Sequence, residues 1–573
     1  MEKETEARYL QWLSNELYDK DLKKELDEIK GNEERINDAF YRDLEFGTGG
    51  LRGVIGAGTN RMNVLTVAKA SQGYSDYLNA TFRNPSVAIA HDSRIKSDLF
   101  SETAASVFAA NGIKVHMYPT LMPTPSLSFA VRHLHCSGGI VVTASHNPAK
   151  YNGYKVYGPD GCQITTKAAE AIQEAINNID IFTSIKRLPF DEGIKTGIIE
   201  WIGEETVNAF INAVSDQSLL KDNDGDKNLS IVYTPLNGAG LKCVTTCLKK
   251  NGYTNIHVVK EQEEPDGNFP TCPYPNPEIR EALELGLRDV RATGSDILIA
   301  TDPDSDRVGI AVPNKEGDYT LLTGNETGVL LLNWIATRRI ELGKMPAKPV
   351  MVKTIVTTDM ATKIAQHYGI EMREVLTGFK YIGEQIGLLE KDGEENRYIL
   401  GFEESYGYLT GSYVRDKDAV DGAMMIADMT AYYRKRGKSL LDVLAELYAE
   451  YGYFYNTLHS YEFDGEAGFE KMKAMTKKLR NEPPTSFAGS TVITRNDYLN
   501  SISTDKDGNE TKIDLPVSDV MKFITESGIS VVVRPSGTEP KLKIYFSIRS
   551  DDKAKAAETE KELRKEIETF LGI

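Results

Sequence analysis

A strand, a polar or glycine-rich loop, a helical stretch and a second strand recur three times in the pattern of hydrophobic and polar positions. The three repeats begin at Val87, Ser230 and Pro349, and in each a glycine separates the helical stretch from the second strand. Strand–helix–strand units in which glycine ends the helix predict mixed or parallel sheets flanked by helices. Because the repeats are about 120 to 140 residues apart, we interpret them as repeated domains and not as a solenoid.

The two ends of the chain have different patterns. Apolar side chains recur at near-helical spacing among charges in the first forty residues, which predicts a helical extension packed on a larger body. These side chains are Tyr9, Leu10, Trp12, Leu13, Leu17 and Tyr18. Near the C-terminus, alternating strands follow a helix predicted from about Gly468 to Leu479 and precede a charged helix from Asp552 to Phe570. This pattern predicts a smaller α+β domain.

The predicted fold class is therefore α/β, with three similar α/β domains that have mixed sheets and a smaller C-terminal α+β domain. The predicted limits are 1–40 for the helical extension, 41–195 for domain I, 196–318 for domain II, 319–455 for domain III and 456–573 for domain IV.

Composition excludes several classes of protein. The 573 residues are 40% hydrophobic and 26% charged, close to the globular average, so a disordered, collagen-like or coiled-coil chain is excluded. Acidic residues outnumber basic ones by 84 to 67, which argues against nucleic-acid and membrane partners. No apolar run approaches the roughly 20 residues of a spanning helix. The charged N-terminus lacks a signal-like segment, and the five scattered cysteines form no disulfide framework, so we expect a cytoplasmic protein.

The strongest metal candidate follows an apolar strand, where Asp302, Asp304 and Asp306 occupy alternate positions. A strand that turns into a tight loop can point alternate side chains the same way and gather three hard oxygen ligands around one divalent cation. An EF-hand is excluded because Arg307 stands where its loop needs glycine and Pro313 where it needs glutamate. A solvated acidic turn is the other interpretation, and it leaves three repelling carboxylates without a cation. Arg307 suits an anionic substrate beside the metal.

A second apolar strand leads to Ser145 and His146, in a loop that Pro148 keeps from being helical. Neighbouring side chains of an extended loop diverge, and the Gly-x-Ser-x-Gly elbow of hydrolases is missing. Local chemistry alone therefore favours a plain Ser-His turn over a nucleophile. The Asn152–Gly153 pair predicts a tight turn that folds Lys155 back toward the serine.

Two further polar loops follow apolar strands. Arg534 precedes two hydroxyls, a glycine and Lys541, an inventory that can bind phosphate, although a simple turn is the alternative. Glu403 and Ser405 lie two residues apart and can bind neighbouring sugar hydroxyls, with a capped helix start as the alternative. All four segments follow predicted strands, where open α/β sheets place ligand sites. Together they indicate phosphoryl transfer on a phosphosugar.

Six motifs carry a family resemblance. They are FGTGGLRG (Phe46–Gly53), TASHNP, DPDSDR, TGFK (Thr377–Lys380), GFEES and RPSGTEP. In this order and at these intervals they resemble the α-D-phosphohexomutase superfamily of phosphoglucomutases and phosphomannomutases. The resemblance covers residues 45 to 545 and implies four domains around a central cleft. It also implies Mg²⁺ as cofactor, a phosphosugar substrate, a glucose 1,6-bisphosphate intermediate that also activates the enzyme, and a monomer or weak homodimer.

The resemblance also assigns roles to individual residues. The implied catalytic residues are Ser145, which would carry the phosphoryl group, and Lys155, Arg52 and His146. The implied metal ligands are Asp302, Asp304, Asp306 and the phosphorylated Ser145. The implied substrate-binding residues are Thr48, Arg307, Thr377, Gly378, Lys380, Glu403, Ser405, Arg534, Ser536, Gly537 and Thr538.

One motif departs from the branch of the family that acts on both glucose and mannose phosphates. That branch has Gly-His after the serine of its Glu-x-Ser motif, whereas this chain has Tyr406 and Gly407. A histidine proton acceptor is therefore missing there, and the sequence is more similar to the phosphoglucomutase branch, which interconverts glucose 1-phosphate and glucose 6-phosphate. Phosphomannomutase or phosphopentomutase activity, a metal-dependent sugar phosphatase and a non-catalytic sugar-phosphate-binding protein are the alternatives.

Overall fold

Each of the three repeats forms a parallel strand–helix–strand unit in the computed structural model, which describes residues 3–15, 17, 19–47, 49–221, 223–463, 465–536 and 541–573. The units are β2 (Ser86–His91), α5 (Ser97–Ala110) and β3 (Lys114–Met117); β7 (Ile231–Thr234), α10 (Gly240–Lys250) and β8 (Ile256–Val258); and β12 (Val350–Thr354), α14 (Met360–His367) and β13 (Glu371–Val375). The helices end two residues before Gly112, Gly252 and Gly369, whose φ angles are 75°, 93° and 65°. Glycine adopts this left-handed conformation without a Cβ clash. The prediction of repeated α/β domains is confirmed.

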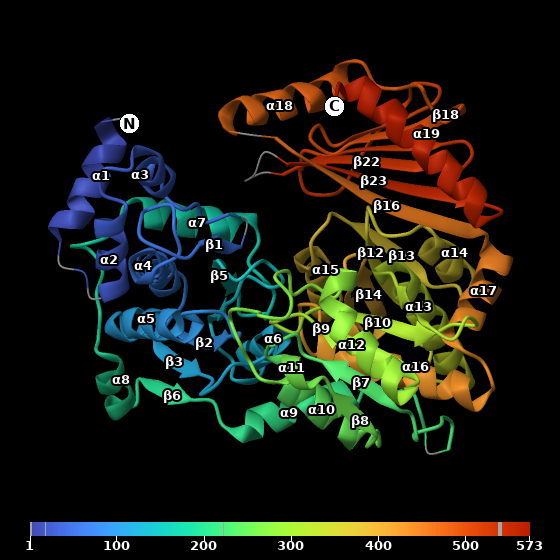
Figure 1. The fold of residues 1–573 in the computed structure, drawn as a ribbon, viewed down its shortest axis with the longest axis horizontal. Helices are drawn as coiled ribbons and strands as arrows, with labels where there is room; N and C mark the ends of the chain where they lie inside the picture. The colour runs from blue at the N-terminus through green and yellow to red at the C-terminus, as the bar shows by residue number, and fades with distance from the viewer. Residues whose placement is uncertain are drawn as a thin grey trace. The chain divides into compact units, whose positions relative to one another are not determined.

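The chain forms two compact units. Figure 1 shows their helices and strands coloured by residue number. Unit 1 contains Met1–Leu322, Ile382–Tyr398 and Tyr406–Gly437, and unit 2 contains Thr323–Tyr381, Ile399–Ser405 and Lys438–Ile573.

The first sheet of unit 1 carries the serine loop. Its further strands are β1 (Gly50–Val54), β4 (Gly138–Val142), β5 (Tyr151–Tyr157) and β6 (Ile199–Trp201), and its helices are α4 (Val64–Thr81), α6 (Thr124–His133), α7 (Thr166–Asn177), α8 (Phe190–Thr196) and α9 (Glu204–Ser215). The strand order is β1-β5-β4-β2-β3-β6, with β1, β5 and β4 antiparallel and the others parallel. Helix α5 packs on β2 and β3, and α6 packs on β2 and β4. Every residue of β4 is buried, so the strand that leads to Ser145 is part of the core.

The predicted turn at Asn152–Gly153 is wrong, because both residues lie inside β5 and pair with β1. A Cβ on Gly153 would lie 2.5 Å from the carbonyl oxygen of Thr143, so this glycine permits close strand approach and does not form a turn. Lys155 instead reaches the serine end of the sheet through the antiparallel β4–β5 pairing, in which it faces Val141. The FGTGGLRG motif (Phe46–Gly53) ends in a strand, β1.

The second sheet of unit 1 carries the aspartate loop. Its further elements are β9 (Ile297–Thr301), β10 (Val308–Pro313), β11 (Tyr319–Leu322), α11 (Lys260–Glu263) and α12 (Arg280–Thr293). The strand order is β11-β10-β9-β7-β8. Thr301 pairs with Val308 in an antiparallel hairpin, so residues 302–307 form the loop between two buried strands. Elements from later in the chain are α15 (Phe379–Lys391), η1 (Glu395–Arg397), β15 (Gly407–Leu409) and α16 (Ala419–Lys435), of which α16 packs on α10.

Unit 2 contains the third repeat and the C-terminal domain. The further elements of the repeat's domain are α13 (Gly324–Glu341), β14 (Tyr398–Glu403) and α17 (Leu440–Tyr451), and β13, β12 and β14 are neighbours in this order. Residues 404–406 form a turn after β14. The alternative of a capped helix start at this motif is therefore wrong.

The C-terminal domain is the predicted smaller α+β domain. Its elements are β16 (Tyr453–Glu462), α18 (Gly465–Asn481), β17 (Ser486–Phe487), β18 (Ser490–Asp497), β19 (Ile502–Asp505), β20 (Glu510–Lys512), β21 (Met521–Thr525), β22 (Ser530–Pro535), β23 (Lys541–Ser550) and α19 (Lys553–Leu571). The order is β16-β23-β22-β21-β18-β19-β20, with β17 paired to β18. Helices α18 and α19 both pack on β23. The two helices were predicted, whereas β16 was not.

The first forty residues form three helices, α1 (Lys3–Ser14), α2 (Lys20–Glu28) and α3 (Glu33–Phe40), and not one continuous helix. The side chains of Asp19 and Asn32 cap the second and third helices and so divide the segment. Tyr9 and Trp12 are buried as predicted, but Leu10 is 53% exposed. Tyr18 lies outside the described residues.

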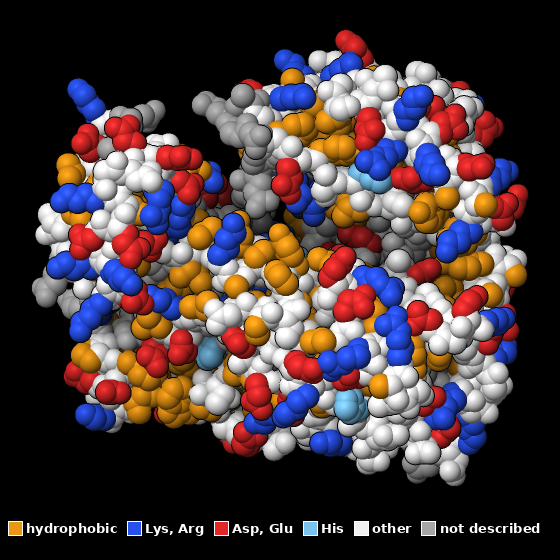
Figure 2. Space-filling view, in the orientation of Figure 1, with side chains coloured by type: hydrophobic (Ala, Val, Ile, Leu, Met, Phe, Trp, Pro, Cys, Tyr) orange, Lys and Arg blue, Asp and Glu red, His pale blue; other side chains and the backbone are white. Residues whose placement is uncertain are grey.

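The surface of the described residues is charged and mixed in sign. Side chains of both signs are interspersed over the described residues of the face shown in Figure 2. Within the described part of the chain, no helix has the length and apolar content that crossing a bilayer requires. All five cysteines are free and buried, as expected without a disulfide framework.

Candidate active site

Asp302, Asp304 and Asp306 converge in the loop between β9 and β10. One carboxylate oxygen of each lies within 4.8 Å of the others, and all three residues are buried. Asp302 Oδ1 accepts hydrogen bonds from the backbone N–H groups of Asp306 and Arg307 at 3.0 and 2.9 Å. Ser305 between them has a left-handed φ of 51°, a conformation that costs a non-glycine residue about 1–2 kcal/mol. The loop thus folds back on itself and gathers the carboxylates.

Two lysines partly neutralise this aspartate cluster. Lys155 Nζ lies 2.8 Å from Asp304 Oδ2 and 3.3 Å from Asp306 Oδ2, and Lys417 Nζ lies 2.7 Å from Asp306 Oδ2. Burial raises the pKa of Asp302 well above its usual range, and the neighbouring carboxylates raise it further. Burial also raises the pKa of Asp304, but Lys155 and Lys417 lower it by more, so the net pKa lies below its usual range. Among the described residues, Asp302 is therefore the carboxylate of the cluster that forms no ion pair with a lysine.

The aspartate cluster fits a divalent cation. Asp304 Oδ1 and Asp306 Oδ1 are buried oxygens that have no hydrogen-bond donor among the described residues. Burying an unpartnered carboxylate oxygen is costly, and a bound cation would remove that cost. Three carboxylate oxygens are the ligand type that Mg²⁺, Ca²⁺ and Mn²⁺ prefer. The residues present therefore fit a hard metal ion.

Ser145 lies beside this cluster, and its Oγ donates to Asp302 Oδ2 at 2.8 Å. The two residues are 157 positions apart, and the family resemblance implied that they lie close together by making both of them ligands of one metal. The loop gives Ser145 a left-handed φ of 52°, and its backbone N–H donates to Thr143 Oγ1 at 2.8 Å. His146 Nδ1 lies 3.2 Å from the same Oγ. Burial lowers the pKa of His146 well below its usual range, and Arg307 and Arg52 lower it further, so the imidazole is neutral.

Arg52 and Arg307 are the other predicted cations of unit 1. Arg52 is exposed in the middle of β1, opposite Gly153 of β5. The Arg307 guanidinium donates to Glu278 at 2.5 Å, so a residue that sequence reasoning missed orients it. The positive charges of both arginines lower the pKa of His146.

The predicted sugar-binding residues gather in unit 2. Glu403 at the end of β14 accepts a hydrogen bond from the Gly378 N–H at 2.9 Å, so the GFEES and TGFK motifs meet. Thr377 Oγ1 is buried with no hydrogen-bond partner among the described residues, and Lys380 lies 5.1 Å from the ring of Tyr381. Ser405 is half-buried in the turn after β14.

The predicted phosphate-binding residues also lie in unit 2. Burial raises the pKa of Tyr545, the carboxylates of Glu404 and Glu403 raise it further, and Arg534 lowers it through charge and a hydrogen bond. Tyr545 of β23 therefore links Arg534 to the sugar-binding segment. The backbone N–H of Ser536 donates to the Lys541 carbonyl at 2.7 Å. The predicted residues Thr48, Gly537 and Thr538 lie outside the described residues.

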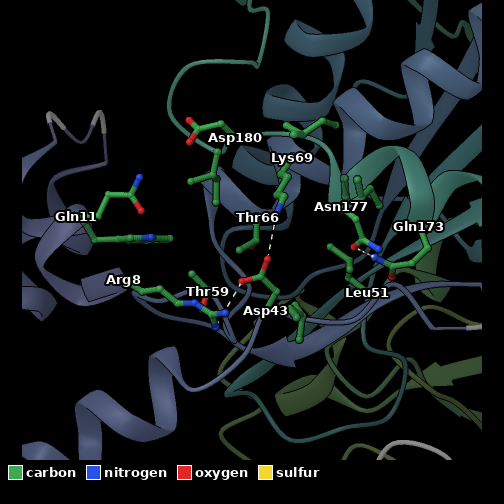
Figure 3. A pocket seen from close by; sticks show the side chains of 16 residues that line it. Arg8, Gln11, Asp43, Leu51, Thr59, Thr66, Lys69, Gln173, Asn177 and Asp180 are labelled. Carbon is green, nitrogen blue, oxygen red and sulfur yellow. Dashed lines mark hydrogen bonds and ion pairs between the residues drawn. The ribbon is translucent and has the colours of Figure 1, made fainter. Parts of the chain in front are cut away.

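A polar cavity of about 220 Å³ lies elsewhere in unit 1, between α1, α4 and α7 (Figure 3). Its cations are paired with carboxylates, since Lys69 lies 2.9 Å from Asp43 and Arg8 lies 2.8 Å from Glu4 and 4.0 Å from Asp43. None of the described predicted site residues lines it. The aspartate–serine site is therefore the better candidate for chemistry on an anionic substrate.

Comparison with known proteins gives matches along most of the chain. Models of the phosphoglucomutase/phosphomannomutase family match as alpha/beta/alpha domains I (residues 43–181), II (208–317) and III (323–451) and as the C-terminal domain (476–566). A phosphoglucomutase of Staphylococcus saprophyticus is 36% identical over 542 residues, 94% of this chain and 96% of the relative. The structure of a putative phosphomannomutase from Thermus thermophilus is similar with a TM-score of 0.68 at 23% identity, covering 92% of this chain and 99% of that one. An Aspergillus fumigatus N-acetylphosphoglucosamine mutase, solved with GlcNAc-6P and magnesium, has a TM-score of 0.50 at 13% identity, covering 92% and 96%.

Proposed function

The chain belongs to the phosphoglucomutase/phosphomannomutase family, and from this premise we propose that it is a phosphoglucomutase that interconverts glucose 1-phosphate and glucose 6-phosphate. The observation that carries the proposal is the 2.8 Å contact between Ser145 Oγ and the buried aspartate cluster. A hydroxyl held beside a site for a divalent cation, with lysines and arginines around it, is suited to carry a phosphoryl group.

In this proposal the phosphorylated Ser145 gives its phosphoryl group to the free hydroxyl of the sugar phosphate. The product is glucose 1,6-bisphosphate, whose other phosphoryl group then returns to the serine oxygen. Lys155, Arg52 and Arg307 stabilise the charge that spreads over the phosphoryl oxygens during both transfers. His146, which is neutral and 3.2 Å from the serine oxygen, is a candidate for holding the proton there.

We propose Mg²⁺ as the cation, held by Asp302, Asp304, Asp306 and the phosphoserine. When ionised, the three carboxylates beside Ser145 face the ammonium groups of Lys155 and Lys417 and the guanidinium of Arg307, whose Nε lies 3.9 Å from Asp306 Oδ1. A phosphoserine adds a charge of about −1.5 to −2, so the aspartate carboxylates would repel the phosphoryl group of the resting enzyme. When bound, Mg²⁺ neutralises this charge and polarises the phosphoryl oxygens. The magnesium in the Aspergillus mutase supports this choice.

In unit 2, we propose that Arg534 and Ser536, with the Gly537 and Thr538 that follow, bind the phosphate that is not being transferred. Glu403, Ser405, Thr377, Gly378 and Lys380 bind the sugar. The contact between Glu403 and Gly378 and the buried Thr377 hydroxyl, which has no hydrogen-bond partner within the described part of the chain, support a polar ligand there. We also propose the domain limits 41–195, 196–318, 319–455 and 456–573, a cytoplasmic location and a monomer or weak homodimer.

A coupled assay tests the function. Glucose 1-phosphate, mannose 1-phosphate and ribose 1-phosphate are compared as substrates, and free phosphate is measured in parallel. We expect isomerised product from glucose 1-phosphate in large excess over free phosphate. Phosphate release at the rate of substrate loss would instead identify a phosphatase that uses the same serine and carboxylates.

Arg534→Lys is expected to raise KM for the sugar phosphate about tenfold, because a guanidinium makes two parallel hydrogen bonds to phosphate and an ammonium does not reproduce that geometry. The intermediate should also escape more often, so activity should depend more on added glucose 1,6-bisphosphate, while Ser145 remains phosphorylatable. Steady-state kinetics with and without added bisphosphate measure both effects. Arg549→Lys, an exposed position on β23 of the same sheet, is the control, and unchanged kinetics in Arg534→Lys would mean that this loop is only a turn.

A further inference from the structure

We propose that Arg94 is a positioning residue for Ser145: its guanidinium holds the loop of residues 144–151 in the conformation that presents the serine hydroxyl to the aspartate cluster. This inference rests on the proposed role of Ser145 as phosphoryl carrier. Sequence analysis did not select Arg94, which follows β2 and lies 51 positions before the serine.

The guanidinium of Arg94 donates hydrogen bonds to the backbone of this loop. One terminal nitrogen donates to the carbonyl oxygens of Pro148 and Tyr151, each at 3.0 Å. The other donates to the carbonyl oxygens of Ser145 and Asn147. Four of the five N–H groups therefore hold four carbonyls of one loop, and none of those four is left to contact a phosphoryl group. Arg94 therefore differs in its proposed role from Arg52 and Arg307, which are proposed to stabilise the phosphoryl oxygens.

A buried carboxylate fixes Arg94 in turn. Its Nε lies 3.3 Å from Asp92 Oδ2, and both side chains have no exposed surface. The same Asp92 oxygen accepts from Thr143 Oγ1 at 2.6 Å, and that hydroxyl accepts the N–H of Ser145. Asp92 thus holds the serine backbone from the amino side through Thr143, while Arg94 holds it from the carboxyl side.

The hydrogen bonds from Arg94 and Thr143 hold Ser145 in a strained backbone conformation. Ser145 has a φ of 52°, which costs about 1–2 kcal/mol for a non-glycine residue and persists only where surrounding contacts determine it. Without the four hydrogen bonds, the loop can relax to an extended conformation that turns Ser145 Oγ away from Asp302. Arg94 therefore acts on orientation, and the chemistry stays with the groups around the serine oxygen.

Arg94 also connects the serine loop to the domain that carries the aspartates. Its guanidinium carbon lies 5.1 Å from the ring centre of Phe269, in a cation–π contact. A Cβ on Gly267 would lie 2.5 Å from the Ile95 nitrogen, so the two segments touch at backbone distance. One side chain thus contacts the serine loop and also Phe269, in the domain II segment that precedes the aspartates in sequence.

The test measures how fast Ser145 is phosphorylated by glucose 1,6-bisphosphate, by rapid quench and intact mass. Arg94→Lys is expected to slow this step and kcat about 10- to 100-fold, since a small misplacement of a reacting group costs up to about that factor. KM should stay within about threefold, because four N–H groups of Arg94 bind the loop and the fifth, on Nε, is buried 3.3 Å from Asp92. The ³¹P resonance of the phosphoserine should shift and broaden.

Arg94→Ala tests the same contact by rescue. Guanidinium at millimolar concentration should restore part of the phosphorylation rate by filling the vacated site. If Arg94→Ala does not fold, Arg94→Lys decides alone. Arg338→Lys is the control, since Arg338 is a buried arginine of α13, in unit 2, that pairs with Glu341.

The outcomes separate the inference from the proposed function. If the wild-type chain neither carries a phosphoryl group on Ser145 nor isomerises sugar phosphates, the proposed function fails. If the wild type does both and Arg94→Lys is phosphorylated at the wild-type rate, or is slowed no more than Arg338→Lys, only the positioning role is overturned.

Discussion

Replacing Ser145 by alanine is expected to lower mutase turnover about 10⁴-fold or more, because the phosphoryl group then has no oxygen to attach to. The fold should survive. The substitution removes the hydrogen bond to Asp302, worth about 1–3 kcal/mol, and leaves the backbone contacts of the loop in place. A coupled assay measures turnover, and intact mass measures the phosphoryl group that the variant should lack.

Ser137→Ala is the matched control for this prediction. Ser137 lies just before β4, at the opposite end of the strand from Ser145, and its hydroxyl accepts the Ser86 N–H at 3.3 Å. Its loss should therefore cost a similar amount of stability and leave turnover unchanged. Near-normal turnover in Ser145→Ala would remove the serine from the reaction and leave the aspartate cluster to act on a different nucleophile.

The repeating part of the fold could be predicted from the sequence because its signals are local. β-branched runs and glycines such as Gly112, Gly252 and Gly369 mark where strands begin and helices stop. The prediction of a turn at Asn152–Gly153 was wrong. A dipeptide that favours a turn in isolation can also lie within a strand where two strands approach closely. Tertiary pairing decided between the two, and no local signal encodes it.

The candidate site was predictable only in part, for the same reason. The aspartates, Ser145 and Lys155 stand in motifs, but Lys417, Glu278 and Arg94 reach the site from segments that carry no local pattern of their own. The ion-pair partner of a charged residue can be predicted from local sequence only when that partner is close in sequence. Once the sheets place β4 beside β5 and β9 beside β10, the distant partners follow from burial, because a buried charge requires a counter-charge.

Asp304→Asn is the second large effect that we expect. It removes one hard anionic ligand and weakens the contact with Lys155, which lies 2.8 Å away. Replacing a residue that hydrogen-bonds a metal ligand lowers metal affinity about 10- to 100-fold, and losing a direct ligand should lower it more. We therefore expect Mg²⁺ affinity to fall by about 100-fold or more. Turnover at limiting Mg²⁺ should fall in parallel and recover in part as Mg²⁺ is raised. Calorimetric titration and the coupled assay measure the two quantities.

Asp296→Asn separates this effect from a general loss of carboxylate. Asp296 precedes β9, at the other end of the strand from the cluster, and accepts the Ser230 N–H at 2.8 Å. Its replacement should leave Mg²⁺ affinity unchanged. Chelation of the wild type should abolish turnover, and added Mg²⁺ should restore it. Because Asp304 Oδ1 and Asp306 Oδ1 are buried without a donor among the described residues, activity that survives chelation would require protons on these carboxylates in place of a cation, and the cluster would then be structural.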